Sequence, residues 1–145
     1  MSNFCLDLEL VPGTLKKGFD WYSLLQHPFA KAAYMMFMIS EVLPFLDGNG
    51  RIARVMINAE LSSKGLSKIM IPTVYREDYM GALKKLTKQR VVDSYIRMTL
   101  SAWEFSSHAH NERLDAIEEY LIACNAFLTD KERYLKIIPD DAKKN

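Results

Sequence analysis

Residues 45–50 place the firmest limit on how this chain folds. They read Phe-Leu-Asp-Gly-Asn-Gly, and two glycines with an asparagine in four positions favour positive φ angles that no regular element uses. Pro44 precedes them and disfavours helical geometry in the residue before it. We therefore expect a helix over 28–42 to end here, and a second helix over 51–64 to begin after the tract.

Beyond this tract the chain has the apolar spacing of helices. The helices expected are 28–42, 51–64, 76–87, 90–106 and 111–128, with a last turn at 131–137. The sequence therefore predicts an all-α fold, a compact bundle of about six helices. Its 145 residues are enough for one core. We expect three stretches: an N-terminal segment at 1–26, a helical core at 27–106, and C-terminal helices with a polar tail at 107–145.

The N-terminal segment has a different period. Leucines at positions 6, 8 and 10 alternate with acidic residues, which is the pattern of a short strand. Pro12 and Gly13 then favour a turn. Residues 14–18 would form the return arm, so we expect a small β-hairpin beside the helices.

Charge and composition argue against several classes of function. Nineteen basic residues oppose eighteen acidic ones, a net charge of +1, so no general attraction to nucleic acid or to a membrane is expected. The apolar run at 32–39 is shorter than the ~20 residues that cross a membrane. Cys5 and Cys124 are too few for a disulfide framework, and no secretory leader is recognised. We expect a cytoplasmic protein with reduced thiols.

The glycine tract also has the composition of an anion site. Gly48, Asn49 and Gly50 between two helices can turn several backbone N–H groups toward one point. The helix that follows adds its own unpaired N–H groups and the positive end of its dipole. Arg51 and Arg54 lie in its first turn by this count, where cations are unfavourable unless an anion is bound. Alternatively, the tract is an ordinary tight turn followed by two solvated arginines.

Asp47 adds a carboxylate to the same stretch. It stands immediately before the glycines and is placed to hold a hard cation such as Mg²⁺ through oxygen. Arg51, Arg54 and Asn58 are spaced i, i+3, i+7 and therefore project from one helix face. Together these residues predict a site for a magnesium-bound polyphosphate.

The stretch from Pro44 to Arg54, PFLDGNGRIAR, resembles the signature of the Fic/Doc family, in which a histidine is followed by P-F-x-D/E-G-N-G-R-x-x-R. The flanking helices and the later stretch YREDYMGAL are similar too, and the resemblance covers about residues 27–105. Such proteins typically move AMP from ATP onto a hydroxyl group of a target protein. The resemblance implies a Fic-like core, ATP as donor, Mg²⁺ as cofactor, an unidentified protein target and a docking flap at 12–18.

The resemblance also implies a role for each residue of the tract. Asp47 would help to hold Mg²⁺, and residues 48–50 would cradle the α- and β-phosphates. Arg51 would pair with the phosphates, and Arg54 would reach the γ-phosphate or an inhibitory glutamate. The family's inhibitory element, Ser/Thr followed four residues later by Glu and then by Gly or Asn, is not found. The chain is expected to be the C-terminal part of something larger.

One position departs from the signature. Leu43 stands where the family has the histidine that accepts the proton of the attacking hydroxyl, and leucine has no lone pair. General-base catalysis contributes about 10²–10⁴-fold, so we expect nucleotide binding with impaired AMP transfer. His27 would lie about 21 Å away, at the far end of a helix, which is too far to replace the base. His108 and His110 lack the further ligands that a metal needs.

Two alternatives remain open. In one, the chain is an active transferase that uses another base or another phosphate-containing donor. In the other, it is a helical protein-interaction module with an empty anion nest. The working surface would then be the hairpin or a basic cluster formed by Lys84, Lys85, Lys88 and Arg90.

Overall fold

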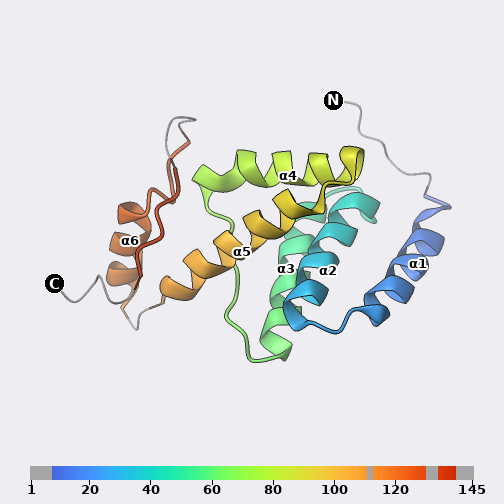
Figure 1. Ribbon diagram of the computed structural model, residues 1–145, viewed down its shortest axis with the longest axis horizontal. Coiled ribbons are helices and arrows are strands. Elements are labelled where there is room, and N and C mark those ends of the chain that lie inside the picture. The colour runs from blue at the N-terminus through green and yellow to red at the C-terminus, as the bar shows by residue number, and fades with distance from the viewer. Residues whose placement is uncertain (1–7, 111–112, 130–133, 140–145) are drawn as a thin grey trace. The chain divides into compact units, whose positions relative to one another are not determined.

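The structure, a computed structural model, describes residues 8–110, 113–129 and 134–139. Within these residues there are six α-helices and no strand. The elements are α1 (Val11–Leu24), α2 (Pro28–Val42), α3 (Asn49–Ser63), the 3₁₀ turn η1 (Thr73–Tyr75), α4 (Arg76–Gln89), α5 (Val92–His108) and α6 (Leu114–Ala123) (Figure 1). The predicted all-α class is confirmed. No helix in the described part of the chain is long and apolar enough to span a membrane.

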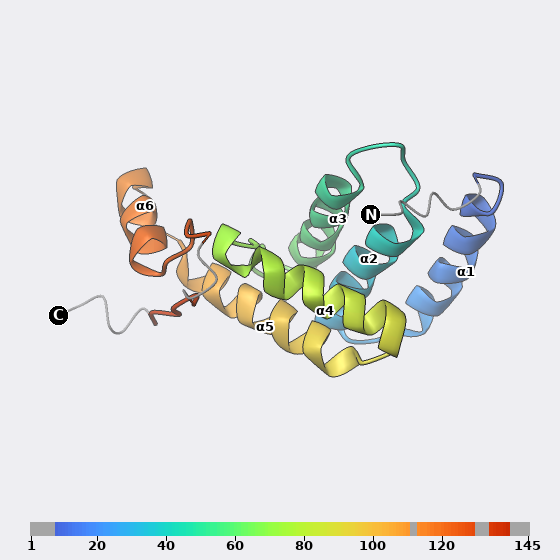
Figure 2. The ribbon, with the colours of Figure 1, turned by 90° about the horizontal axis from the view of Figure 1, so that it is seen from above.

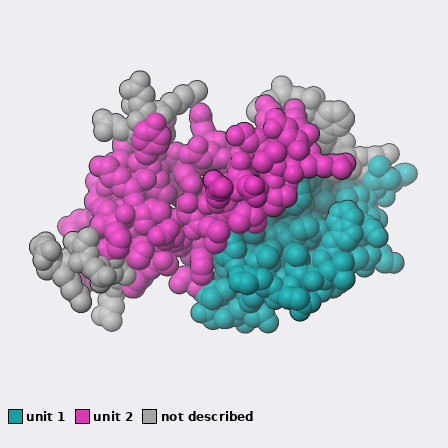
Figure 3. Space-filling view, viewed as in Figure 1, with its two compact units in different colours: residues 1–66 teal, residues 67–145 magenta. Residues whose placement is uncertain are grey.

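The chain divides into two compact units, residues 1–66 and residues 67–145 (Figure 3). The first unit contains α1, α2 and α3, and the second contains η1 and α4 to α6. The boundary falls inside the stretch 27–106, whose limits stay a prediction.

The predicted N-terminal hairpin is wrong where the structure describes it, because residues 11–24 form α1. Pro12 lies in the first turn of this helix, where its missing N–H is not needed. The inward positions of α1 are 11, 15, 18 and 22, which is the spacing of a helix face; positions 11 and 18 are buried and the other two half-buried. The strand predicted from the alternation at 6–10 is also wrong for residues 8–10, which form a turn, while residues 6 and 7 lie outside the described residues.

Close contact between α1 and α2 depends on Gly18. A methyl group at this position would collide with Sδ of Met38 and lie 3.2 Å from its Cγ. The hydroxyl of Tyr34, on α2, donates a 3.0 Å hydrogen bond to the carbonyl of Gly18. The absence of a side chain at position 18 therefore lets the two helices approach each other.

A polar contact joins α1 to α3 in the same unit. The Tyr22 hydroxyl donates to the Glu60 carboxylate, with both carboxylate oxygens at 2.8 Å. Lys31, from α2, lies 4.7 Å from the centre of the Tyr22 ring. Partial burial, and then the neighbouring carboxylate, raise the pKa of Tyr22 above its usual value.

The helix α2 lies between α1 and α3, and the three helices are side by side in both ribbon views (Figure 1 and Figure 2). Its buried residues are Phe29, Ala32, Ala33, Met35, Met36, Met38, Ile39 and Val42. The partner face of α3 consists of Ala53, Ile57 and Leu61, all with no exposed surface. The predicted helix over 28–42 is confirmed, and the one predicted over 51–64 begins two residues earlier and ends at Ser63.

In the second unit, α4 and α5 form an antiparallel pair joined by Arg90 and Val91 (Figure 2). Arg90 has a φ of 57°, so α5 begins at Val92 and not at residue 90 as predicted. The helix predicted over 111–128 is shorter, because α6 ends at Ala123. The predicted last turn is wrong for residues 134–137, which are not helical, while 131–133 lie outside the described residues.

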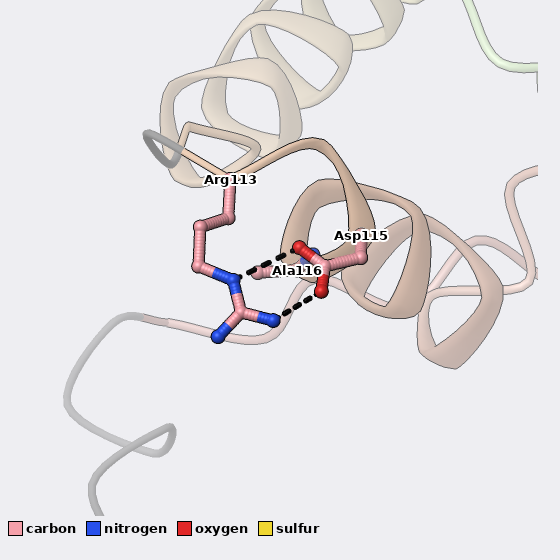
Figure 4. A network of polar contacts seen from close by, with 3 residues as sticks. All are labelled: Arg113, Asp115 and Ala116. Carbon is pink, nitrogen blue, oxygen red and sulfur yellow. Dashed lines mark hydrogen bonds and ion pairs between the residues drawn. The ribbon is translucent and has the colours of Figure 1, made fainter.

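The end of α5 packs against α6 around stacked rings. The rings of Phe105 and Tyr120 have centres 5.9 Å apart, and Cys124 is a buried free thiol in the same cluster. At the start of α6, Arg113 Nε and the Ala116 N–H each donate a 3.0 Å hydrogen bond to Oδ1 of Asp115 (Figure 4). The Arg113 guanidinium lowers the pKa of the Asp115 carboxyl. A carboxylate in this first turn interacts favourably with the positive end of the helix dipole.

Candidate functional site

The loop between α2 and α3 begins at Leu43, which caps α2 in a left-handed conformation. Its φ and ψ are 49° and 56°, and its N–H donates a 3.2 Å hydrogen bond to the carbonyl of Ile39. Pro44 follows, so the helix ends where the sequence predicts. The Leu43 side chain is 38% exposed. Leucine is uncommon in this backbone region, in which asparagine, aspartate and histidine are enriched.

Asn49 holds the loop closed. Its Nδ2 donates to the carbonyl of Phe45 at 2.7 Å, and its Oδ1 accepts the N–H of Phe45 at 3.0 Å. One side-chain amide therefore satisfies both backbone groups of a residue four positions earlier. The sequence prediction had assigned Asn49 to the phosphates and missed Phe45 as its partner. The i, i+4 spacing of an asparagine after a helix break was the only signal for this contact.

The helix α3 starts with a bare N-terminus. Gly48 is its N-cap, with a φ of 80° that favours glycine, and no side chain caps the helix. The first hydrogen bond inside the helix runs from the Ile52 N–H to the Gly48 carbonyl, at 2.9 Å. The N–H groups of residues 49–51 therefore have no acceptor within the helix. These donors, together with the positive dipole end, suit an anion.

Two arginine side chains lie beside this N-terminus. A methyl group at Gly48 would be 3.4 Å from Nη2 of Arg51, and one at Gly50 would be 3.7 Å from Nη1 of Arg54. Both guanidinium groups thus fold back toward the start of α3, the direction in which helix side chains point. Since the helix begins at Asn49, Arg54 lies in the second turn and not in the first as predicted. At these distances a methyl group on either glycine would make only ordinary van der Waals contact with the guanidinium group.

Asp47 is the acidic residue of the loop. Its Oδ2 lies 3.4 Å from Nη2 of Arg51, and the two side chains are 93% and 75% exposed. An exposed ion pair of this length contributes little to stability and is readily exchanged for other partners. No cluster of three or more His, Cys, Asp or Glu suited to a metal occurs among the described residues. A lone carboxylate suits Mg²⁺ only as one ligand of an ion whose other ligands are phosphate and water, and this role of Asp47 stays a prediction.

Other predicted residues lie elsewhere in the fold. His27 is the N-cap of α2, a helix of 15 residues whose other end carries Leu43. Asn58 is half-buried two turns along α3 from the N-terminus. His108 is the last residue of α5, and His110 Nδ1 lies 2.6 Å from the carbonyl of Ser107. His27 therefore lies at the opposite end of α2 from the loop, whereas His108 and His110 belong to the second unit.

The exposed start of α3 thus presents backbone donors without a helix acceptor and, beside them, two arginine side chains. Residues 5–61, which include this site, match the Fic/DOC family. The match contains all of α1, and so it begins well before residue 27, where the predicted resemblance starts. The resemblance to this family is confirmed. That Leu43 occupies the position of the family's histidine stays a prediction.

Several relatives carry the name protein adenylyltransferase. The chain is 32% identical over 89 residues to protein adenylyltransferase Fic of Drosophila willistoni, covering 59% of this chain and 18% of that protein. It is 33% identical over 79 residues to protein adenylyltransferase fic-1 of Caenorhabditis elegans, covering 52% of this chain and 16% of that protein. Protein adenylyltransferase Fic of Drosophila persimilis is 32% identical over 78 residues, covering 54% of this chain and 15% of that protein. The chain spans less than a fifth of the length of these relatives.

Proposed function

We propose that the start of α3 binds the phosphates of a magnesium nucleotide, and that the chain is a Fic-type domain of the AMP-transferring kind with an impaired transfer step. The observation that carries the proposal is the convergence of three backbone N–H groups and two guanidinium groups on one helix N-terminus. The Fic/DOC match, which includes these residues, and the names of the relatives support it.

Each residue of the site has a distinct task in this proposal. The N–H groups of residues 49–51 donate to phosphate oxygens, and Gly48 and Gly50 keep the approach open. Arg51 and Arg54 supply charge-assisted hydrogen bonds to the phosphates. Asp47 holds Mg²⁺, which when bound neutralises part of the phosphate charge. The Asn49 side chain acts indirectly, by holding the loop in its shape.

The impairment follows from the chemistry of transfer. A target hydroxyl oxygen forms a bond to the α-phosphorus, the bond to the bridging oxygen breaks, and pyrophosphate leaves. The hydroxyl proton needs an acceptor, and Leu43, where α2 ends beside the loop, has none. His27 lies at the other end of α2, about 22 Å away along a helix of this length. Binding can therefore persist while transfer loses about 10²–10⁴-fold in rate.

Nucleotide binding is tested by calorimetry. ATP with Mg²⁺ is titrated into the purified chain, into Arg51→Ala, and into the control Arg76→Ala, which removes an exposed cation at the start of α4. We expect the parent and the control to bind saturably and Arg51→Ala to bind roughly tenfold more weakly or worse, since charged hydrogen bonds contribute about 1.5–3 kcal/mol. Equal binding by all three, or none at millimolar ATP, would contradict the proposal and favour an interaction module with an empty nest.

The missing base is tested by Leu43→His. Histidine tolerates the left-handed conformation of this position better than leucine, so the backbone does not oppose the change. We expect transfer of a label from the α-phosphate of ATP to protein to rise by about 10²–10⁴-fold. Leu43→Asn is the matched control, because asparagine also tolerates this conformation but is not a base. A Leu43→His variant that binds ATP yet transfers no faster than Leu43→Asn would favour another base or another donor.

A further inference from the structure

A groove lies between α4 and α5 of the second unit. Its volume is about 390 Å³, at the lower end of the range of small-molecule pockets. It is lined by Tyr75, Asp78, Gly81, Ala82, Lys85, Ser94, Arg97, Met98 and Ser101. All of these residues belong to the second unit, so the groove is complete without any part of residues 1–66.

The groove exists because the facing positions of the two helices carry small side chains. On α4 these are Gly81 and Ala82, and on α5 they are Ser94 and Ser101, one turn on either side of Arg97 and Met98. A methyl group at Gly81 would meet no atom within 4 Å. The helices pair along their length, yet this stretch stays open.

The lining of the groove includes two cations, Lys85 on α4 and Arg97 on α5. Lys85 lies five residues before the connecting turn at Arg90, and Arg97 lies seven residues after it, so an antiparallel pair brings them to the same level. No ion pair within the described residues involves either of them. The groove carries one acid, Asp78, about two helical turns from Lys85. One end of the groove is therefore basic, with the Ser94 hydroxyl beside it.

We propose that this groove binds a small organic anion, a phosphate or carboxylate attached to a flat apolar group. The anionic group pairs with Lys85 and Arg97, both of which donate charge-assisted hydrogen bonds to such oxygens. The apolar part lies on Ala82 and Met98, which are buried and form the floor. Gly81 leaves the width that a flat ring needs.

The test uses phenyl phosphate, which combines a phosphate monoester with a ring. It is titrated into the ¹⁵N-labelled full chain carrying Arg51→Ala, so that the proposed nucleotide site does not compete for the phosphate. We expect saturable shifts of the backbone amide signals of Gly81, Ala82, Ser94 and Ser101. Failure of the nucleotide proposal leaves this result unaffected, because the lining residues are all outside the first unit.

Three variants locate the binding. Lys85→Gln with Arg97→Gln removes the two positive charges of the groove lining and is expected to weaken binding by roughly tenfold or more. Lys84→Gln with Lys88→Gln removes the same charge from exposed positions of α4 outside the groove and is expected to leave binding within about twofold. Gly81→Leu fills the open space and is expected to abolish the shifts without unfolding α4, because leucine is a better helix former than glycine.

Four outcomes would overturn the proposal. The first is an absence of saturable shifts at millimolar phenyl phosphate, and the second is equal weakening of binding by the groove pair (Lys85→Gln with Arg97→Gln) and the control pair (Lys84→Gln with Lys88→Gln). The third is unchanged binding by Gly81→Leu. The fourth is binding of inorganic phosphate as tight as that of phenyl phosphate. The last would show that the ring contributes nothing and that the groove is only a basic surface. Tighter binding of phenyl phosphate, lost in both groove variants, would support the site.

Discussion

Replacing Gly18 with alanine tests how closely α1 packs on α2. The added methyl would collide with Sδ of Met38 and lie 3.2 Å from its Cγ. Met38 is buried, so its side chain has little room to turn aside. The 3.0 Å hydrogen bond from Tyr34 to the Gly18 carbonyl holds the α1 backbone in place. The helix cannot move outward without lengthening that bond.

The expected magnitude follows from two opposing effects. Alanine in a helix interior is favoured over glycine by about 0.5–1 kcal/mol, and overpacking a core costs about 1–3 kcal/mol. Gly18→Ala should therefore lower the free energy of unfolding by about 0–2.5 kcal/mol. Gly13, in the same helix, is the matched control, because a methyl group there meets no atom within 4 Å. Gly13→Ala should raise the free energy of unfolding by about 0.5–1 kcal/mol.

Urea unfolding followed by helical circular dichroism measures both variants. The difference between them isolates the packing cost, which should be about 1–3 kcal/mol. A third comparison uses Met38→Ala, in which the colliding side chain is absent. Gly18→Ala should then cost nothing, and the cycle should show a coupling between positions 18 and 38. A Gly18→Ala variant as stable as Gly13→Ala, or a cost that persists in Met38→Ala, would refute the close contact.

Two further predictions concern single hydrogen-bonding side chains. Ser106→Ala should lower the free energy of unfolding by about 1–3 kcal/mol, because the buried Ser106 Oγ accepts the Met70 N–H at 2.7 Å. The control is Ser107→Ala, at a partly exposed neighbour, which should change the stability measured by urea unfolding little. Equal effects of the two changes would contradict this prediction. Asn49→Ala should speed amide hydrogen exchange at Phe45, and Asn49→Asp should slow it again, because only the aspartate keeps an acceptor for that N–H. Exchange that is the same in all three would show that Asn49 does not hold the loop.

The break between α2 and α3 is the part of the fold that the sequence determined on its own. Pro44 restricts the residue before it, and Gly48 permits a φ of 80°. Both effects act through the bonds next to the residue, so no distant contact is needed to produce them. The helix over 28–42 and the all-α class were predictable for a different reason, which is the helical spacing of apolar residues along most of the chain.

The candidate site was predictable in composition and only partly in geometry. The residues at 47–51 do lie together at one helix N-terminus. The sequence does not show whether the Asn49 side chain faces a ligand or the Phe45 backbone, because this depends on the path of the loop between the two residues. In the structure it contacts the Phe45 backbone. Arg54 lies in the second turn of α3 and not in the first as predicted, because the helix begins at Asn49, two residues earlier than expected.

Tertiary packing decided the conformation of residues 11–24. Alternating leucines at 6–10 and a Pro-Gly pair favour a hairpin when only local preferences are weighed. Residues 11–24 instead form α1. Its Gly18 packs beside Met38 and accepts a hydrogen bond from Tyr34, and both of these side chains are distant in sequence. A short amphipathic helix is marginal by itself and gains most of its stability from such packing. The sequence pattern could not show this, because the partner that makes the helix favourable lies on another element.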